Sequence, residues 1–466
     1  MSENKYKYLA KNTAVFAISS FGSKLLVFLL VPFYTRVLST EEYGSVDLVT
    51  TTSSLLTFVV TICIADAVIR FAIDGVSSRY GVFRFGIEVV SFGSLIFALI
   101  LFVVRSIHIF DLEDYYYLFL FAILYTGAIS QVISNYLRAI DRVKDVGVMG
   151  ILVTLFTIVS NLLLLLVFKL GVVGFLLSNV IGHLIPAFYG FYIIYRYDRA
   201  CFSQICSKET KRQMVMYSLP LIFNGLAWWA NSCLDRYFIV FYFSAAVNGV
   251  YAVASKIPTI LNTINQIFSQ AWNLSAIKEY DGEDKSGFFG GIYSLYNFIL
   301  VSGCSFLILL NIPLAKILFA KEFFEAWNYS SLLLISTVFS AMSSILGSVF
   351  VAVKNSKIFA YSTVVAAGLN ALFNWILIPI YGALGAAIAT VISFFAIWLI
   401  RYICVVRYIK LRINIVRDVF SYVLLVSQSV LEHIGNHNYY LQSLVFIVIL
   451  LLYKTEISNG LSKTNR

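Results

Sequence analysis

The chain has too little charge for a soluble protein of its length. Charged residues make up 12% of the 466 positions, whereas hydrophobic residues make up 60% and the mean hydropathy is +0.85. A soluble domain surrounds its core with a shell rich in charge, and about a quarter of its residues are charged. Apolar runs recur along the whole chain instead, each close to the ~20 residues that cross a bilayer as a helix. These properties exclude a soluble fold and predict an all-α integral membrane protein.

Residues that carry covalent or metal chemistry are few and scattered. The six cysteines fall in predicted spans or inner segments, so they imply no disulfide framework. The spacing of Cys201 and Cys206 does not fit a zinc knuckle, and the four histidines show no metal-ligand spacing. No P-loop is present, so we do not expect the chain to hydrolyse ATP itself. We therefore expect no cofactor, no metal site and no enzymatic activity.

Two further observations narrow the class of membrane protein. The first apolar run is too long for the h-region of a cleavable signal peptide, and no small-residue cleavage site follows it. Asp111, Glu113 and Asp114 form a cluster in an outer loop, where membrane glycosyltransferases place paired carboxylates. The loop is short and has no large outer domain beside it. We interpret the cluster as part of a solvated loop.

We predict about fourteen membrane-spanning helices, of which the last two are short and weakly separated. Lys and Arg concentrate on alternate connections, which predicts that both termini lie in the cytoplasm. The formal net charge of +10 is spread over many short loops, so it does not indicate a nucleic-acid partner. The predicted spans are 12–36, 46–69, 84–104, 115–137, 146–168, 172–195, 214–242, 248–272, 288–311, 327–352, 358–380, 384–408, 418–433 and 440–454.

The chain contains an internal repeat. Three pairs of short segments match in order at a separation of about two hundred residues, which indicates duplication. Each repeat has six spans, so the two halves are parallel repeats with a cavity between them. The predicted organisation is an N-lobe over 1–200, a C-lobe over 201–412 and a two-helix appendix with a tail over 413–466. The pairs are Ser39–Thr50 with Ser244–Ser255, Ala139–Lys144 with Ala352–Lys357, and Lys169–Gly174 with Ile380–Gly385.

Cations inside the predicted spans indicate a negatively charged ligand. Lys24 and Lys256 lie near mid-span, where a cation costs about 2.5–3.5 kcal/mol on insertion scales. Arg236 lies nearer the outer end of the seventh span and Arg70 near the inner end of the second, and a guanidinium can grip a phosphate in bidentate fashion. A structural ion pair with another helix is the alternative for Arg236.

Amide and hydroxyl groups accompany these cations on the eighth span. They recur at three- and four-residue steps and so form one helix face, from which Asn262 and Gln266 are our candidate substrate contacts. Such a face suits a wet cavity that accepts many hydroxyl groups. The alternative is hydrogen bonding between helices. The face comprises Lys256, Thr259, Asn262, Thr263, Gln266, Ser269, Gln270 and Asn273.

Three carboxylates are candidates for ion coupling: Asp66, Glu88 and Asp235. Asp66 lies four residues before Arg70 on the same helix face, so a local ion pair is the alternative reading for both. Asp235 precedes Arg236 directly and cannot share its face.

Four segments of the chain form a pattern typical of a known family: Asn12 with Pro32–Gly44 (PFYTRVLSTEEYG), Ala67–Phe71 (AVIRF), Asp235–Ile239 (DRYFI) and Asn248–Lys256 (NGVYAVASK). They resemble the polysaccharide-transport family of the multidrug/oligosaccharidyl-lipid/polysaccharide exporter superfamily, which includes O-antigen and capsule repeat-unit flippases. The similarity runs over the first twelve spans and contains no strict active-site motif.

The resemblance implies a V-shaped, two-lobed helical transporter in the bacterial cytoplasmic membrane. Its substrate would be an undecaprenyl-diphosphate-linked oligosaccharide, moved to the outer leaflet by alternating access with an ion gradient. Related flippases have a cationic central cavity, which here maps onto Lys24, Arg70, Arg236 and Lys256. Implied partners are membrane lipid, the polysaccharide polymerase and a chain-length regulator of lipopolysaccharide synthesis. The rival functions are a multidrug antiporter, a lipid II flippase and, less favoured, a membrane polymerase or glycosyltransferase.

Overall fold

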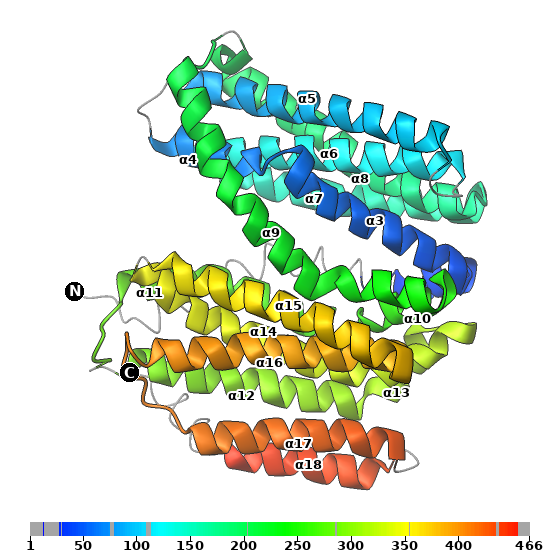
Figure 1. Ribbon diagram of the computed structural model, residues 1–466, viewed down its shortest axis with the longest axis vertical. Helices are drawn as coiled ribbons and strands as arrows, with labels where there is room; N and C mark the ends of the chain where they lie inside the picture. Colours follow the sequence, from blue (N-terminus) through cyan, green and yellow to red (C-terminus); the bar gives the residue numbers. More distant parts are fainter. Residues whose placement is uncertain are drawn as a thin grey trace. The chain divides into compact units, whose positions relative to one another are not determined.

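The computed structural model describes residues 30–74, 79–108, 113–202, 204–284, 287–353, 355–434 and 438–454, together with the isolated positions 13 and 28. All regular elements in these ranges are helices (Figure 1). Eight of the described helices are long and apolar enough to cross a membrane, and a bent pair makes a ninth span. Helices occupy every predicted span from 46–69 onward, which confirms the all-α membrane fold. Of the first predicted span, the structure describes the end, which forms α2 (Val31–Val37).

The chain divides into two compact units. The N-terminal unit is Val37–Trp229, and the C-terminal unit is Ala230–Arg466 together with the first segment up to Arg36. Helix α9 (Lys208–Tyr242) begins in the N-terminal unit and ends in the C-terminal unit. The boundaries of the lobes that the repeat predicts, at 200 and 412, stay predictions.

The N-terminal unit is a bundle built around α6, which packs on α3, α4, α5 and α8. Its elements before α9 are α3 (Thr40–Val60), α4 (Ile64–Asp74), α5 (Arg79–Ser106), α6 (Asp114–Ala139), α7 (Val143–Leu162), the π-helical turn η1 (Leu163–Val167), α8 (Gly171–Tyr197) and η2 (Arg199–Phe202).

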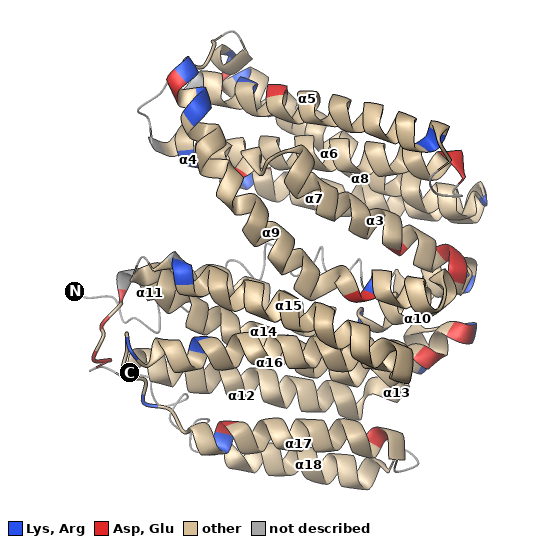
Figure 2. Ribbon diagram, in the orientation of Figure 1, with Lys and Arg blue, Asp and Glu red and all other residues tan. Residues whose placement is uncertain are grey.

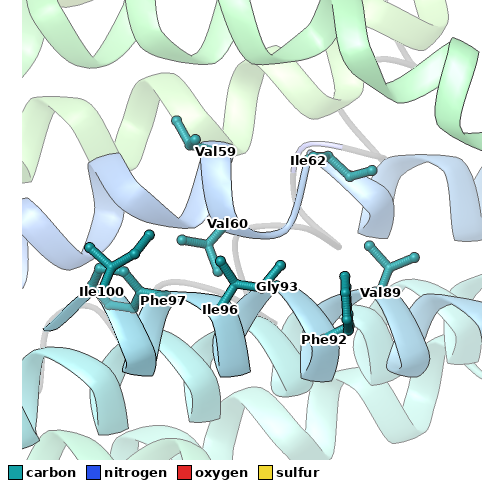
Figure 3. Close-up of a pocket in the computed structure, with 9 residues that line it drawn as sticks. All are labelled: Val59, Val60, Ile62, Val89, Phe92, Gly93, Ile96, Phe97 and Ile100. Atoms are coloured by element: carbon teal, nitrogen blue, oxygen red, sulfur yellow. The ribbon is translucent and has the colours of Figure 1, made fainter. Parts of the chain in front are cut away.

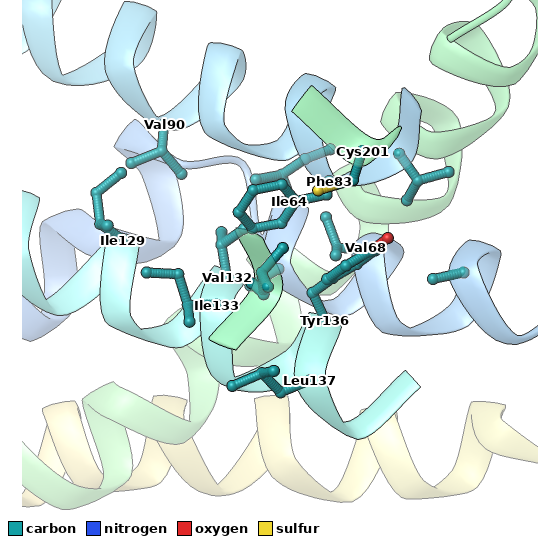
Figure 4. Packing of buried hydrophobic residues seen from close by; sticks show 14 of the residues in the cluster. Ile64, Val68, Phe83, Val90, Ile129, Val132, Ile133, Tyr136, Leu137 and Cys201 are labelled. Atoms are coloured by element: carbon teal, nitrogen blue, oxygen red, sulfur yellow. The ribbon is translucent and has the colours of Figure 1, made fainter. Parts of the chain in front are cut away.

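The core of the N-terminal unit extends into the segment that follows α8. Val68 of α4, Phe83 of α5 and Val132 of α6 are fully or almost fully buried together, and the ring of Tyr136 lies 4.8 Å from that of Phe83 (Figure 4). Cys201 of η2 belongs to the same cluster. The connection after the sixth span is therefore packed against this bundle, because its apolar side chains complete the core.

The C-terminal unit is organised around α14, which is largely buried and packs on α11, α12 and α16. Helices α17 and α18 lie side by side and pack on α12 (Figure 1). The elements are α10 (Ala245–Ala254), α11 (Thr259–Lys278), α12 (Phe288–Leu309), α13 (Asn311–Leu318), η3 (Lys321–Ala326), α14 (Trp327–Ala352), α15 (Ser356–Tyr381), α16 (Ala383–Val405), α17 (Ile415–Ile434) and α18 (Tyr439–Leu452).

Matching residues of the repeat have matching structural roles. Ser39 and Ser244 are both N-caps, and their hydroxyls accept hydrogen bonds from the backbone N–H groups of Glu42 and Val247. An N-cap side chain satisfies a donor that the first helical turn leaves unpaired. Gly171 starts α8 with φ +51°, and Gly382 directly precedes α16 with φ +61°, a conformation that glycine adopts without strain. These equivalences confirm the duplication.

The second helix of each repeat is broken in the structure. The first break, residues 61–63, separates α3 from α4 and bends the pair by 53°. Gly93 of α5 packs against it so closely that a Cβ there would lie 2.0 Å from the carbonyl oxygen of Val60. The second break, residues 255–258, separates α10 from α11 and ends at Pro258. Broken helices in membranes occur where the freed backbone is buried in protein or lines a water-filled cavity.

Candidate functional site

Charged residues lie mainly near helix ends in both units, and few lie along the middle of helices (Figure 2). Because the placement of one unit against the other is not determined, each half of the candidate site is described within its own unit. Lys24 lies outside the described residues.

Lys256 lies in the break between α10 and α11, within the predicted eighth span but not in a continuous helix. Its side chain is half-buried, and its backbone N–H donates to the carbonyl of Val253 at 2.9 Å. Pro258 follows within the same break and has no backbone N–H. The structure thus places a cation in non-helical backbone between two helices.

Part of the polar face predicted on α11 is exposed, whereas Thr263 is buried and its hydroxyl donates to the Thr259 carbonyl at 2.8 Å. Thr259 and Gln266 are exposed, Asn262 is half-buried between them, and Gln270 is exposed one turn further on. Their opposite neighbours turn inward: the indole of Trp272 donates to the Ser348 hydroxyl at 2.6 Å. Asn262 and Gln266 therefore stand on a surface of the C-terminal unit from which they can reach a ligand.

Asp235 and Arg236 lie near the end of α9 in the same unit. Asp235 is buried, and its Oδ2 accepts hydrogen bonds from Tyr251 Oη at 2.5 Å and from Thr390 Oγ1 at 3.5 Å. Arg236 is half-buried, and its Nη1 lies 3.6 Å from the sulfur of Cys233. Hydroxyl groups from α10 and α16 thus hold the carboxylate in place beside the guanidinium-bearing residue.

Asp66 and Arg70 are exposed on α4 of the N-terminal unit, just after the first helix break. Within the described part of the chain, the Asp66 carboxylate forms no ion pair with Arg70, so the local pair considered as an alternative is not observed. Both side chains are accessible.

Glu88 of α5 has a different environment. Its carboxylate pairs with Arg84 at 2.9 Å and with Lys211 of α9 at 3.2 Å, and its side chain is 44% exposed. The contact with Lys211 fastens the first turn of α9 to α5. Its proposed role in ion coupling stays a prediction.

An apolar pocket of about 410 Å³ lies between the first helix break and α5 (Figure 3). Val60 contributes from the end of α3, Ile62 from the break, and Phe92, Gly93 and Ile96 from α5. Its lining is aliphatic and aromatic throughout, so this pocket provides no group that would fix a polar headgroup.

The sequence interpretation missed Arg401 of α16. The side chain is 4% exposed, and its guanidinium donates to the Ser362 hydroxyl at 2.9 Å, the Ser343 carbonyl at 3.0 Å and the Thr363 hydroxyl at 3.1 Å. It also lies over the ring of Phe359, 4.1 Å from the centroid. A cation within a predicted apolar span was the signal that identified Lys24, and it applies equally here.

The sequence interpretation also missed the buried acids of α17. Asp418 is fully buried near the start of the helix, where its Oδ1 accepts from Arg417 Nη2 at 3.0 Å and from Tyr453 Oη at 3.1 Å. Glu432, 1% exposed, lies near the other end. The two acids are about four helical turns apart and so share one face. Two acids at this spacing within one predicted span were the available signal.

Within the described residues, no group of histidine, cysteine or acidic side chains is arranged to hold a metal ion. The buried cysteines outside the spans are unsuited to nucleophilic chemistry. Burial, with the nearby Asp198 carboxylate, raises the pKa of the Cys201 thiol to about 12. The chemistry of both units is thus that of cations, carboxylates, amides and hydroxyls on membrane helices.

Residues 9–272 match the family described as polysaccharide biosynthesis protein, which is more than half of the chain. The chain belongs to this family. This result confirms the resemblance noted in the sequence. The chain is also 24% identical, over 272 residues, to an uncharacterized membrane protein of Methanocaldococcus jannaschii. That alignment covers 53% of this chain and 61% of the relative, which is less than two thirds of its length.

Solved structures show that this family member has a transporter fold. The lipid II flippase MurJ in an inward closed conformation matches with a TM-score of 0.70 at 14% identity, over 96% of this chain and 99% of that one. An outward-facing multidrug resistance MATE family transporter of the MOP superfamily matches with a TM-score of 0.64 at 13% identity, over 88% and 97%. The protein is a multi-pass membrane protein with the two-lobed fold of these transporters.

Proposed function

We propose that the protein is a flippase that carries an oligosaccharide repeat unit, linked to a polyprenyl diphosphate such as undecaprenyl diphosphate, across the bacterial cytoplasmic membrane by alternating access. The repeat unit belongs to an O-antigen, capsule or exopolysaccharide. The observation that carries the proposal is a cation in a helix break, Lys256, next to an exposed amide face on α11 in a polysaccharide biosynthesis protein. The proposed orientation places both termini in the cytoplasm.

The chemistry of the residues supports a diphosphate ligand. Arg70, Arg236 and Lys256, with Lys24, would meet the diphosphate, since guanidinium and ammonium groups form charge-assisted hydrogen bonds with phosphate oxygens. Asn262 and Gln266 would bind sugar hydroxyls, because an amide both donates and accepts hydrogen bonds. The polyprenyl chain would stay in the lipid.

Ion coupling is part of the proposal, and Asp235 is its favoured carboxylate. It is buried, it is held by hydroxyls of two helices, and it precedes the substrate-binding candidate Arg236. Asp66 and Glu88 are the further candidates, and of these Glu88 already has two cations beside it. The polymerase and chain-length regulator would receive the translocated unit.

The principal rival is multidrug antiport, because MATE transporters share the fold. A carrier of cationic drugs would be expected to line its cavity with carboxylates, whereas Arg236, Lys256 and Arg70 are cations. A lipid II flippase would use the same diphosphate chemistry and differs in the sugar that it carries.

The test is complementation of a strain that lacks the gene. We expect that Arg236→Ala and Lys256→Ala each lower the transport rate and the surface polysaccharide at least tenfold, because one charge-assisted hydrogen bond contributes about 1.5–3 kcal/mol. Lys316→Ala is the matched control, since Lys316 is exposed on α13 and should behave as wild type. Normal polysaccharide in both variants at normal expression would refute the proposal. Drug hypersensitivity with normal polysaccharide in the deletion strain would establish antiport.

A further inference from the structure

Buried polar side chains surround the Glu432 carboxyl near the end of α17. Its Oε1 accepts a hydrogen bond from Asn311 Nδ2 of α13 at 2.8 Å. The Ser331 hydroxyl of α14 lies beside the carboxyl and is 2.8 Å from the Ser429 hydroxyl of α17. These four residues, which we call the acid pocket, are all buried. Three helices of the C-terminal unit therefore meet at one carboxyl group.

Two oxygen atoms of the acid pocket have no hydrogen-bond donor. Glu432 Oε2 and Asn311 Oδ1 are both buried and make no hydrogen bond. Buried polar atoms in proteins almost always have a partner, so two orphans on one hydrogen-bonded pair require an explanation. An ionised carboxylate only accepts hydrogen bonds, whereas a protonated carboxyl has an O–H donor. A proton on Glu432 would supply the donor that the pocket lacks.

Charge balance points to the same conclusion. In the described part of the chain, no cation lies within ion-pair distance of Glu432. The ring nitrogens of His433 instead contact the carbonyls of Ser429 at 2.9 Å and Asn328 at 3.0 Å. An unpaired buried carboxylate is strongly disfavoured relative to its neutral form. The other titratable groups on the elements around the pocket are Tyr293, Tyr296, Cys304, Lys316, Lys321, Glu322, Glu325, Tyr329, Arg417, Asp418, Tyr422, Tyr439 and Tyr440.

Gln428, one turn before Glu432 on the same face of α17, is also a buried polar residue, but it carries an amide. Gln428 accepts a hydrogen bond from the Ser305 hydroxyl at 2.7 Å and donates to the Ser305 carbonyl at 3.0 Å. An amide therefore suffices where only helix packing is needed. A carboxyl at Glu432 adds one property that an amide lacks, which is a proton that can leave.

We propose that Glu432 is a proton-binding site, and that loss of its proton loosens the packing of α17 against α13 and α14. Glu432 is two residues from the end of α17, which corresponds to about 3 Å along the helix. The proton would exchange with water on the side where α17 ends, which is the outer side in the predicted topology. We infer further that this proton drives transport, an inference that rests on the proposed flippase function.

The test measures access to the acid pocket as a function of pH. Ser429→Cys places a thiol in the pocket, and a small membrane-impermeant alkylating reagent is applied from outside to the reconstituted full-length protein between about pH 5.5 and 8.5. Peptide mass spectrometry reads the modified residue, so the native cysteines do not interfere. Tyr440→Cys, at a residue 90% exposed on α18, is the reference that corrects for thiol ionisation.

The expected result is that labelling at position 429, relative to the reference, rises at least tenfold from the acidic to the alkaline end. In Glu432→Gln, which stays neutral, the ratio should remain low at every pH. Glu432→Asp keeps a titratable carboxyl and should retain the rise. A ratio that does not change with pH in the parent would overturn the proposal. So would a rise that persists in Glu432→Gln and disappears in His433→Gln, because the proton would then belong to His433.

A second measurement separates this proposal from the flippase function. Glu432→Gln should abolish the pH dependence of transport while Arg236→Ala abolishes transport itself. If the substrate is not a lipid diphosphate, the labelling result at position 429 is unaffected. If labelling follows the expected pattern but transport keeps its pH dependence in Glu432→Gln, then Glu432 binds a proton and that proton does not drive transport.

Discussion

Replacing Asp418 with alanine should destabilise the protein much more than removal of an ordinary surface carboxylate. Asp418 is fully buried, and Arg417 is 8% exposed, with its Nε and Nη2 at 3.1 and 3.0 Å from Asp418 Oδ1. The Tyr453 hydroxyl donates to the same oxygen at 3.1 Å. Asp418→Ala removes the carboxylate oxygen on which a buried guanidinium and a hydroxyl converge.

The size of the effect follows from this geometry. Removing one partner of a buried ion pair costs about 3–5 kcal/mol, because the remaining charge loses its compensation. Arg417 lies in the first turn of α17 and can shift its head group toward water, which favours the lower end, about 3 kcal/mol. Replacing both residues, as in Arg417→Met with Asp418→Leu, removes both charges and should cost about 1 kcal/mol or less.

The assay is unfolding of the purified protein by SDS in mixed micelles, followed by helical circular dichroism. Glu283→Ala is the matched control in the same unit: its carboxylate is 54% exposed and pairs with Lys410 at 2.9 Å. Exposed pairs contribute about 1 kcal/mol or less. The reasoning fails if Asp418→Ala costs no more free energy of unfolding than Glu283→Ala, or if the double variant is as unstable as Asp418→Ala.

Three other substitutions or reactions test separate features. Gly93→Ala should lower the free energy of unfolding by about 1–3 kcal/mol in the same SDS titration, because the new Cβ would lie 2.0 Å from the Val60 carbonyl oxygen. Unchanged stability would show that α5 can move away from the break. Burial raises the pKa of the Cys201 thiol to about 12, so the group stays a thiol at pH 8. Mass spectrometry should show that Cys201 is alkylated at least tenfold more slowly in the folded protein than in SDS. Equal rates would contradict its burial. Arg401→Lys should be less stable than Arg401→Met, because a lysine keeps the buried charge and loses the guanidinium fork; the opposite order in thermal unfolding would refute this argument.

Much of the fold was predictable because its signals are local. The length of an apolar run identifies a membrane span, and matching short segments such as Ser39–Thr50 and Ser244–Ser255 identify the repeat. The N-cap roles of Ser39 and Ser244 follow from the same segments. The bend at residues 61–63 was not predicted, because Thr61, Ile62 and Cys63 continue an apolar run and contain neither glycine nor proline.

The candidate site was only partly predictable. The sequence identified Asp235 as an intramembrane carboxylate but not its partners, since Tyr251 and Thr390 come from other helices. The sequence likewise identified Glu88 as a candidate carboxylate but not its partner Lys211, which comes more than a hundred positions later. Ion pairs and hydrogen bonds between distant segments depend on helix packing, which the order of residues along the chain does not reveal.

Composition, periodicity and duplication were enough to establish an all-helical membrane protein of two related halves, with cations and amides on the second helix of the second half. Those features need only the 3.6-residue period and the length of a bilayer span. The tertiary structure decided which polar groups are buried and which residues form their hydrogen bonds and ion pairs. It placed Lys256 in a helix break, buried Glu432 among polar side chains and left Gln266 exposed. Burial is a property of the packed helices, because each neighbour comes from a different part of the chain.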